Sequence, residues 1–129
     1  MLVDTDVLIW HLLGYAEATR RLDELGAITL SAVSYLELLQ RMRNKAELEA
    51  VKKMLERRNA RVLPKTEAIT LRAVALMESL TLSHGLQPGG ALIAATALEH
   101  GLQVLTGNVK HFTIISGLQV SAFSLHASR

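Results

Sequence analysis

The sequence predicts an α/β fold with three layers, in which helices cover both faces of a central, mainly parallel sheet. Short runs of β-forming residues alternate along the chain with longer segments of helical spacing, and no repeat or linker interrupts this alternation. With 129 residues, the chain is expected to form one domain, residues 1–129. The strand candidates are Leu2-Val3, Ala27 to Leu30, Arg61 to Leu63, Gln103 to Leu105 and Gln119 to Phe123.

The clearest helical segment runs from Thr66 to His84, with Thr66 as the expected N-cap and Gly85 and Pro88 ending it. Its apolar residues fall at i, i+4, i+7, i+8 and i+11, which places them on one face. Three further segments predict helices: Val33 to Asn44, Ala46 to Arg58, and Pro88 to His100 closed by Gly101. The last of these is apolar on nearly all sides, so we expect it to be buried.

Composition excludes several classes of protein. The longest apolar stretch, Ala91 to Leu98, is far shorter than the ~20 residues that span a bilayer. The chain has no cysteine, which excludes disulfides and thiolate metal sites, and a cytoplasmic location is expected. The net charge of +2 is compatible with a phosphate-bearing partner. Aromatic residues make up only 4% of the chain, so base stacking is not expected to dominate any contact with RNA.

Two aspartates follow the first predicted strand, at the edge where parallel sheets bind ligands. Asp4 comes directly after the strand, and Asp6 stands at the start of the next helix. Either aspartate could simply cap that helix. We assign the cap to Asp6 and the functional role to Asp4.

Glu37 lies within an apolar run, where an unpaired carboxylate is costly to desolvate. It is a candidate site residue, although it could instead sit at the edge of a buried stripe or pair with Arg41 at i+4. No zinc-type cluster, phosphate-binding glycine loop or Ser-His-Asp arrangement competes with these carboxylates. Asp4 and Glu37 therefore predict a site for a hard divalent cation such as Mg²⁺.

Polar residues also follow the fourth predicted strand, at Thr106, Gly107 and Asn108. Their hydroxyl and amide oxygens could position a water or a phosphate oxygen, or they could be ordinary turn residues. His111, just beyond, is a candidate base with a structural role as the alternative. Basic residues at 41–45 and 57–65 could contact phosphates or form solvated helix faces.

Four blocks, in order over nearly the whole chain, resemble the PIN domain of the VapC ribonuclease toxins. They are Leu-Val-Asp-Thr-Asp-Val-Leu-Ile-Trp, Ser-Ala-Val-Ser-Tyr-Leu-Glu-Leu, Ala-Leu-Ile-Ala-Ala-Thr-Ala-Leu-Glu-His-Gly-Leu and Leu-Thr-Gly-Asn-Val-Lys-His-Phe. The resemblance implies a PIN-like α/β/α fold and a Mg²⁺- or Mn²⁺-dependent endoribonuclease. It also implies pairing with a VapB-type antitoxin and a homodimer.

The resemblance assigns Asp4 and Glu37 to the first two acidic positions and Asn108 to the fourth. The third is an Asp at the start of the Ala-Leu-Ile-Ala-Ala helix, and here that position is Gly90. Gly107 stands where the family commonly has a basic residue. A missing carboxylate should weaken the hold on a cation, so reduced activity is expected, while glycine at a helix N-terminus leaves the fold intact.

Three functions remain open from the sequence. The first is an endoribonuclease in which Asp4 and Glu37 hold Mg²⁺ while Asn108 and Thr106 position the water or the scissile phosphate. The second is a catalytically silent module that still binds an antitoxin or RNA. An α/β domain with an unrelated small ligand ranks last, because no nucleotide-binding fingerprint supports it.

Overall fold

A computed structural model describes residues 1–125 of the chain. Its centre is a five-stranded sheet in the order β3-β2-β1-β4-β5, and every neighbouring pair of strands is parallel. The strands are short: β1 is Leu2–Val3, β2 Thr29–Ser31, β3 Arg61–Leu63, β4 Val104–Thr106 and β5 Val120–Ala122. The predicted sheet is thus confirmed, and it is parallel throughout.

The strand order reverses direction at β1. Strands β2 and β3 follow outward on one side, and the chain then returns to place β4 and β5 on the other side. The carboxyl ends of β1 and β4 therefore meet at the switch point, where open parallel sheets bind their ligands. Asp4 follows β1 directly, and Thr106 is the last residue of β4.

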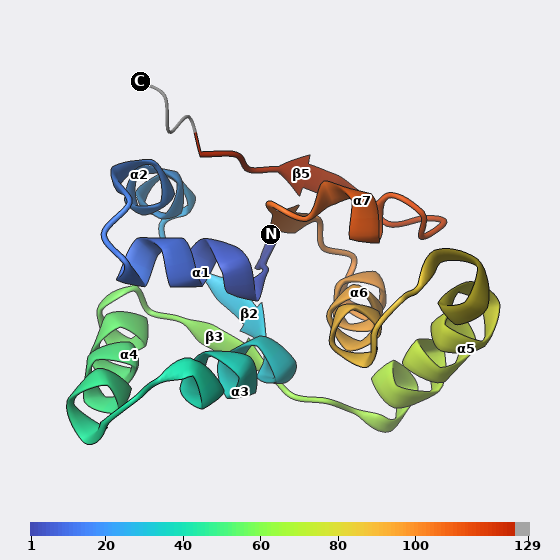
Figure 1. Cartoon of the computed structure of the whole chain (residues 1–129), viewed down its shortest axis with the longest axis horizontal. Helices are drawn as coiled ribbons and strands as arrows, with labels where there is room; N and C mark the ends of the chain where they lie inside the picture. Colours follow the sequence, from blue (N-terminus) through green and yellow to red (C-terminus); the bar gives the residue numbers. More distant parts are fainter. Residues whose placement is uncertain (126–129) are drawn as a thin grey trace.

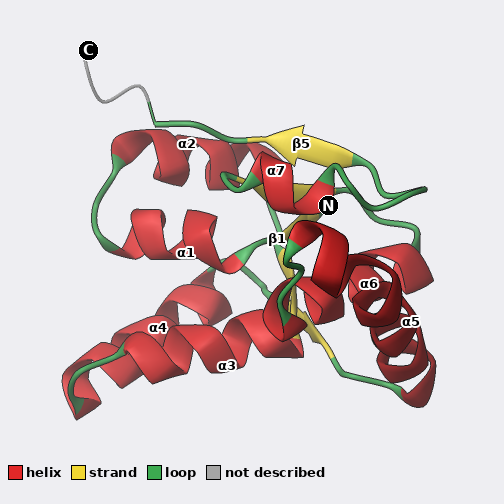
Figure 2. Cartoon of the chain, turned by 45° about the vertical axis from the view of Figure 1, so that its right-hand side comes forward, coloured by secondary structure: helices red, strands yellow, loops and turns green. Residues whose placement is uncertain are grey.

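Helices form the two outer layers (Figures 1 and 2). Four helices cover one face: α1 (Thr5–Leu12), α2 (Ala16–Leu25), α3 (Ala32–Arg41) and α4 (Lys45–Arg57). The other face carries α5 (Glu67–His84), α6 (Pro88–His100) and α7 (Val109–Phe112). Within the described chain, no helix combines the length and apolarity needed to cross a membrane.

The sheet separates two hydrophobic cores, one on each face. Successive residues of β1 and of β4 pack into different cores. Leu2 and Val104 pack under α5 and α6, whereas Val3 and Leu105 pack under α1–α4. Successive strand residues point to opposite faces, and both faces are covered, which is why β1 and the first two residues of β4 are apolar throughout. The α6 helix is buried through its residues 91, 93–95 and 97, as its all-round apolar pattern predicts.

Most predicted elements are present with small shifts of their ends. Thr66 caps α5 by accepting a hydrogen bond from the Ile69 amide, and Gly85 ends that helix in the left-handed region. Gly101 ends α6 in the same way. The helix α2 was not predicted, because it is polar and buries only Ala18 and Leu22.

Candidate active site at the carboxyl edge of the sheet

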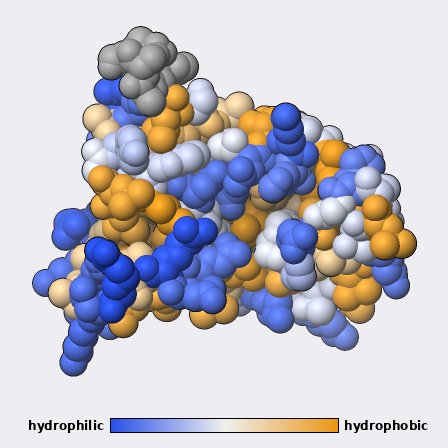
Figure 3. Space-filling view, in the orientation of Figure 1, coloured by the Kyte–Doolittle hydropathy of each residue, from blue (hydrophilic) through white to orange (hydrophobic). Residues whose placement is uncertain are grey.

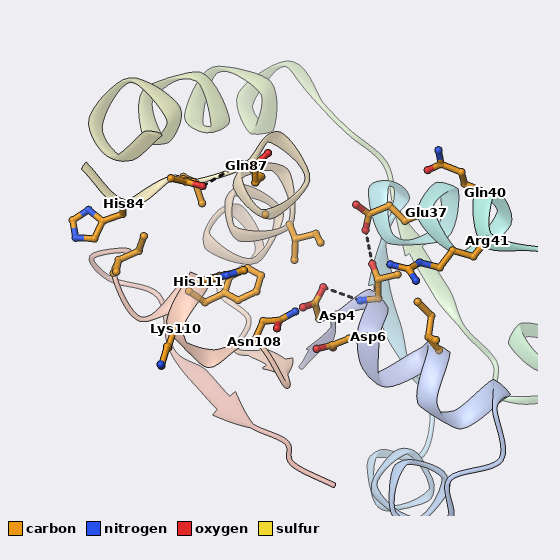
Figure 4. Close-up of a pocket in the computed structure, with 18 residues that line it drawn as sticks. Asp4, Asp6, Glu37, Gln40, Arg41, His84, Gln87, Asn108, Lys110 and His111 are labelled. Atoms are coloured by element: carbon orange, nitrogen blue, oxygen red, sulfur yellow. Dashed lines mark hydrogen bonds between the residues drawn. The ribbon is translucent and has the colours of Figure 1, made fainter. Parts of the chain in front are cut away.

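A pocket of about 440 Å³ opens at the switch point of the sheet (Figure 4). Its walls come from the β1–α1 junction, α3, the turn between α5 and α6, α6 itself, and α7 with the residue before it. Its polar lining residues are Asp4, Thr5, Asp6, Glu37, Gln40, Arg41, His84, Gln87, Asn108, Lys110 and His111.

Asp4 is held at the base of the pocket by hydrogen bonds to both carboxylate oxygens. The Thr5 amide donates to Oδ1 and the Thr106 hydroxyl donates to Oδ2, each at 2.7 Å. Burial raises the pKa of Asp4 above its ordinary value, the two hydrogen bonds oppose that rise, and the nearby charge of Glu37 adds to it. The Thr5 bond makes Asp4 the N-cap of α1, so the assignment of that cap to Asp6 was wrong.

Glu37 reaches the same pocket from α3. Its Oε1 accepts a 2.6 Å hydrogen bond from the Thr5 hydroxyl, so Thr5 bridges the two carboxylates through its amide and its hydroxyl. Glu37 forms no ion pair with Arg41 in the described part of the chain, so the i+4 pair considered from the sequence is not present. The fold thus brings together the two acids that lie 33 positions apart in the sequence.

Asp6, which the sequence analysis assigned only to the helix cap, also lines the pocket. Its Oδ2 accepts a 3.0 Å hydrogen bond from the Gly107 amide, while its buried Oδ1 has no partner among the described residues. Burial, followed by the charge of Asp4, raises the pKa of Asp6 to about 6. The sequence signal was the Asp-x-Asp spacing, which sends both carboxylates to one edge of the sheet.

Thr106 and Asn108 lie at different depths. Thr106 is fully buried behind Asp4. Its hydroxyl also accepts a hydrogen bond of 2.9 Å from the backbone amide of Asn108. Asn108 is exposed and lines the pocket, and its side chain does not cap α7. Thr106 therefore contacts the site through Asp4, whereas Asn108 faces the pocket itself.

Gly107 is in close contact with Trp10. A Cβ atom at position 107 would lie 2.5 Å from the Trp10 ring and 2.9 Å from Asp6 Oδ2. The Trp10 ring, which also packs against Phe123 at a centroid distance of 5.5 Å, fills the space that a side chain at 107 would need. In this arrangement a basic residue at 107 would require Trp10 to move.

Gly90, the third residue of α6, lines the same pocket as the acids. A Cβ atom built there meets only Leu86 Cδ1, at an ordinary 3.6 Å. A Cβ at the preceding Gly89 would instead lie 2.7 Å from Glu37 Oε2. Position 90 thus has room for a side chain, whereas a side chain at position 89 would require the Glu37 carboxylate to move.

The oxygen ligands of the pocket fit a hydrated divalent cation. Asp4 and Glu37 supply hard carboxylate oxygens, and Mg²⁺ commonly binds through one or two carboxylates while keeping several waters. The buried, unpartnered Oδ1 of Asp6 adds uncompensated negative charge nearby. Residues 1–125 contain no group of three or more metal-binding side chains, so the donor set is a sparse one.

Comparison with known proteins agrees with this fold. Residues 1–115 match the PIN domain family. The ribonuclease VapC10 of Mycobacterium tuberculosis is 41% identical over 125 residues, which cover 92% of this chain and 90% of the relative. Among solved structures, a toxin-antitoxin complex from Klebsiella pneumoniae has 26% identity and a TM-score of 0.78, with 94% of this chain and 95% of that chain covered.

VapBC2 from Rickettsia felis, bound to a DNA fragment from its promoter, shares the fold with a TM-score of 0.81 at 17% identity, covering 95% of this chain and 98% of that chain. The family match spans most of the sequence, and the site residues lie within it. The chain therefore belongs to the PIN-domain family, as a homologue of the VapC ribonucleases, which are hydrolases.

Proposed function

We propose that this chain is a Mg²⁺- or Mn²⁺-dependent endoribonuclease toxin whose activity is weakened by Gly90. The observation that carries the proposal is the shared hydrogen-bonding of Asp4 and Glu37 to Thr5, which sets two carboxylates in one pocket with the open position at Gly90. The cytoplasmic location and the single domain expected from the sequence stay predictions.

Asp4 and Glu37 would hold the cation, with Asp4 fixed in orientation by the Thr106 hydroxyl. A cation bound there supplies Lewis-acid stabilisation for phosphodiester hydrolysis. Asn108, exposed on the pocket wall, would position the attacking water or the scissile phosphate. Thr106 would act through Asp4 and through the Asn108 amide, to which its hydroxyl is also bonded.

Gly90 would lower activity because it removes one negative charge from the cation site. The charge and number of ligands set the affinity of an oxygen site for divalent cations. An Asp at position 90 would enter the pocket past Leu86 without a clash at its Cβ. It would also place a carboxylate in the first turn of α6, where the helix dipole favours negative charge.

RNA cleavage with Mg²⁺ or Mn²⁺, in the absence of antitoxin, tests the proposal. We expect slow cleavage by the chain itself and a rise of at least about tenfold in Gly90→Asp, which corresponds to about 1.4 kcal/mol. Gly90→Asn is the matched control because it adds nearly the same volume without the charge. Intact RNA after incubation with Gly90→Asp would refute the proposal, and equal rates for the Asp and Asn variants would refute the role of the charge.

The second candidate is a catalytically silent module that binds an antitoxin or RNA. The sparse donor set of two carboxylates favours it. Calorimetry distinguishes the two candidates: heat of Mg²⁺ binding that is lost in Asp4→Asn supports the enzyme, whereas no heat at millimolar Mg²⁺ supports the silent module.

A VapB-type antitoxin is the proposed protein partner, because the chain resembles the toxin of solved toxin-antitoxin complexes. Its tail would lie across the acidic pocket and the helices beside it. Stable association during co-expression is the expected result. A chain that shows no affinity for its antitoxin would contradict this partnership.

A homodimer is also proposed, supported by the exposed apolar side chains Leu71, Val74 and Leu82 on α5. Figure 3 shows hydrophobic residues at the right-hand edge of the molecule, where α5 lies in Figure 1. Sedimentation should give a dimer that Leu82→Glu dissociates. A monomeric parent chain at micromolar concentration would contradict it.

A further inference from the structure

Basic side chains stand on two opposite sides of the acidic pocket. Arg41 extends from the end of α3 beside Glu37, while Lys110 and His111 extend from α7 on the far side (Figure 4). All three line the pocket and are exposed. Asp4 and Asp6 lie between these two groups, so the centre of the pocket is negative and its two sides are positive.

Arg41 and Lys110 have no ion pair within residues 1–125, so both are available to a ligand. Arg43 pairs with Glu47 at 2.9 Å, and Arg58 pairs with Asp23 at 2.9 Å. The residues of the two basic clusters in the sequence therefore have different surroundings in the fold. Of those two clusters, only Arg41 lines the pocket, and Lys110 joins it from another element.

We infer that a single RNA strand crosses this pocket with its phosphates bound by Arg41 on one side of the acids and by Lys110 and His111 on the other. The inference rests on the proposed function, because it takes RNA as the ligand. Three acids at the centre repel a phosphate, so a strand needs cations on both sides to approach.

The lining favours recognition of the backbone over base stacking. Phe112 is the one Phe, Tyr or Trp of the lining, and it is only 2% exposed, so it offers no platform for a base. Gln40, Gln87 and Asn108 are exposed amides on the same walls and can bond base edges or sugar hydroxyls. Affinity should therefore come mainly from phosphates and fall with salt.

Fluorescence anisotropy of a short labelled oligouridylate, measured with EDTA over a range of salt, tests the inference. Neutralising one phosphate contact on a single strand should reduce the slope of log affinity against log salt by about 0.7. We expect this reduction for Arg41→Gln and for Lys110→Gln, and a larger one for the double variant. Arg57→Gln and Lys53→Gln are matched controls, because both residues are exposed on α4 outside the pocket.

Unchanged slopes in both pocket variants, slopes reduced equally in the controls, or no RNA binding at low salt would each overturn the inference. EDTA separates this result from the nuclease proposal. If Gly90→Asp cuts RNA but the slopes do not change, the strand path alone is wrong. If the slopes change but Gly90→Asp leaves RNA intact, the strand path stands and the nuclease proposal fails.

Discussion

The Thr5 hydroxyl donates a 2.6 Å hydrogen bond to Glu37 Oε1 and thereby joins the start of α1 to the middle of α3. The amide of the same residue donates to Asp4. One buried threonine thus sets the relative positions of the two carboxylates on which the proposed cation site depends.

Thr5→Val should destabilise the fold by about 1 kcal/mol, because it removes a hydrogen bond to a charged group that can partly turn to solvent. Urea unfolding measures the change. Thr5→Ser, which keeps the hydroxyl, should recover most of it. A serine variant as unstable as the valine variant would show that the methyl group, not the hydrogen bond, matters at this position.

Thr106→Val should be more harmful, with a loss of about 2 kcal/mol in the free energy of unfolding. The fully buried Thr106 hydroxyl donates a hydrogen bond to Asp4 and accepts one from the backbone amide of Asn108. Both partners would therefore lose a hydrogen bond in the valine variant. The loss should also raise the pKa of Asp4 further, because the Thr106 bond favours its ionised form. NMR titration of the Asp4 carboxyl would check this, and an unchanged pKa would contradict it.

Gly107→Ala should destabilise the chain by about 1–3 kcal/mol through overlap with the Trp10 ring. Combining it with Trp10→Leu tests the cause, because the two changes should then be less harmful than the sum of each alone. Trp10 is the single tryptophan, so its fluorescence reports its displacement directly. If the losses of unfolding free energy in the two single variants simply add in the double variant, the contact with Trp10 is not the cause of the destabilisation.

Acid should destabilise the fold through His11. Burial first, and then the charge of Arg58, lower the pKa of this histidine below 6.5, and it is hydrogen-bonded to the Thr19 hydroxyl. The unfolded chain therefore binds the proton more readily, so the stability contributed by neutral His11 is fully present above pH 6.5 and is lost as the pH falls through the folded pKa.

His11→Gln should reduce the decline in unfolding free energy between neutral pH and about pH 5, measured by urea unfolding at each pH. The comparison with the parent chain isolates the histidine from other groups. Parallel pH profiles for the two proteins would contradict this assignment.

The fold and half of the site follow from local patterns. The Thr66 cap, the Gly85 and Gly101 ends and the alternation of strands and helices need only neighbouring residues. The rule that ligands bind at strand ends indicated Asp4, and the apolar surroundings of Glu37 made it a second candidate. The prediction failed where a contact between distant segments decides the outcome.

Asp6 illustrates this failure. Local sequence cannot separate two aspartates at one helix start, and only the turn after β4 shows that Asp6 bonds the Gly107 amide while Asp4 caps the helix. The contact between Trp10 and Gly107 joins residues 97 positions apart, and no spacing pattern in the sequence predicts it.

Mn²⁺ binding measured by calorimetry tests most directly whether Asp4, Glu37 and position 90 face one cation site. The account predicts weak binding by the chain itself, none in Asp4→Asn or Glu37→Gln, and affinity at least about tenfold tighter in Gly90→Asp than in Gly90→Asn. Equal Mn²⁺ affinity in all of these proteins would contradict it, because the carboxylates would then not share a cation.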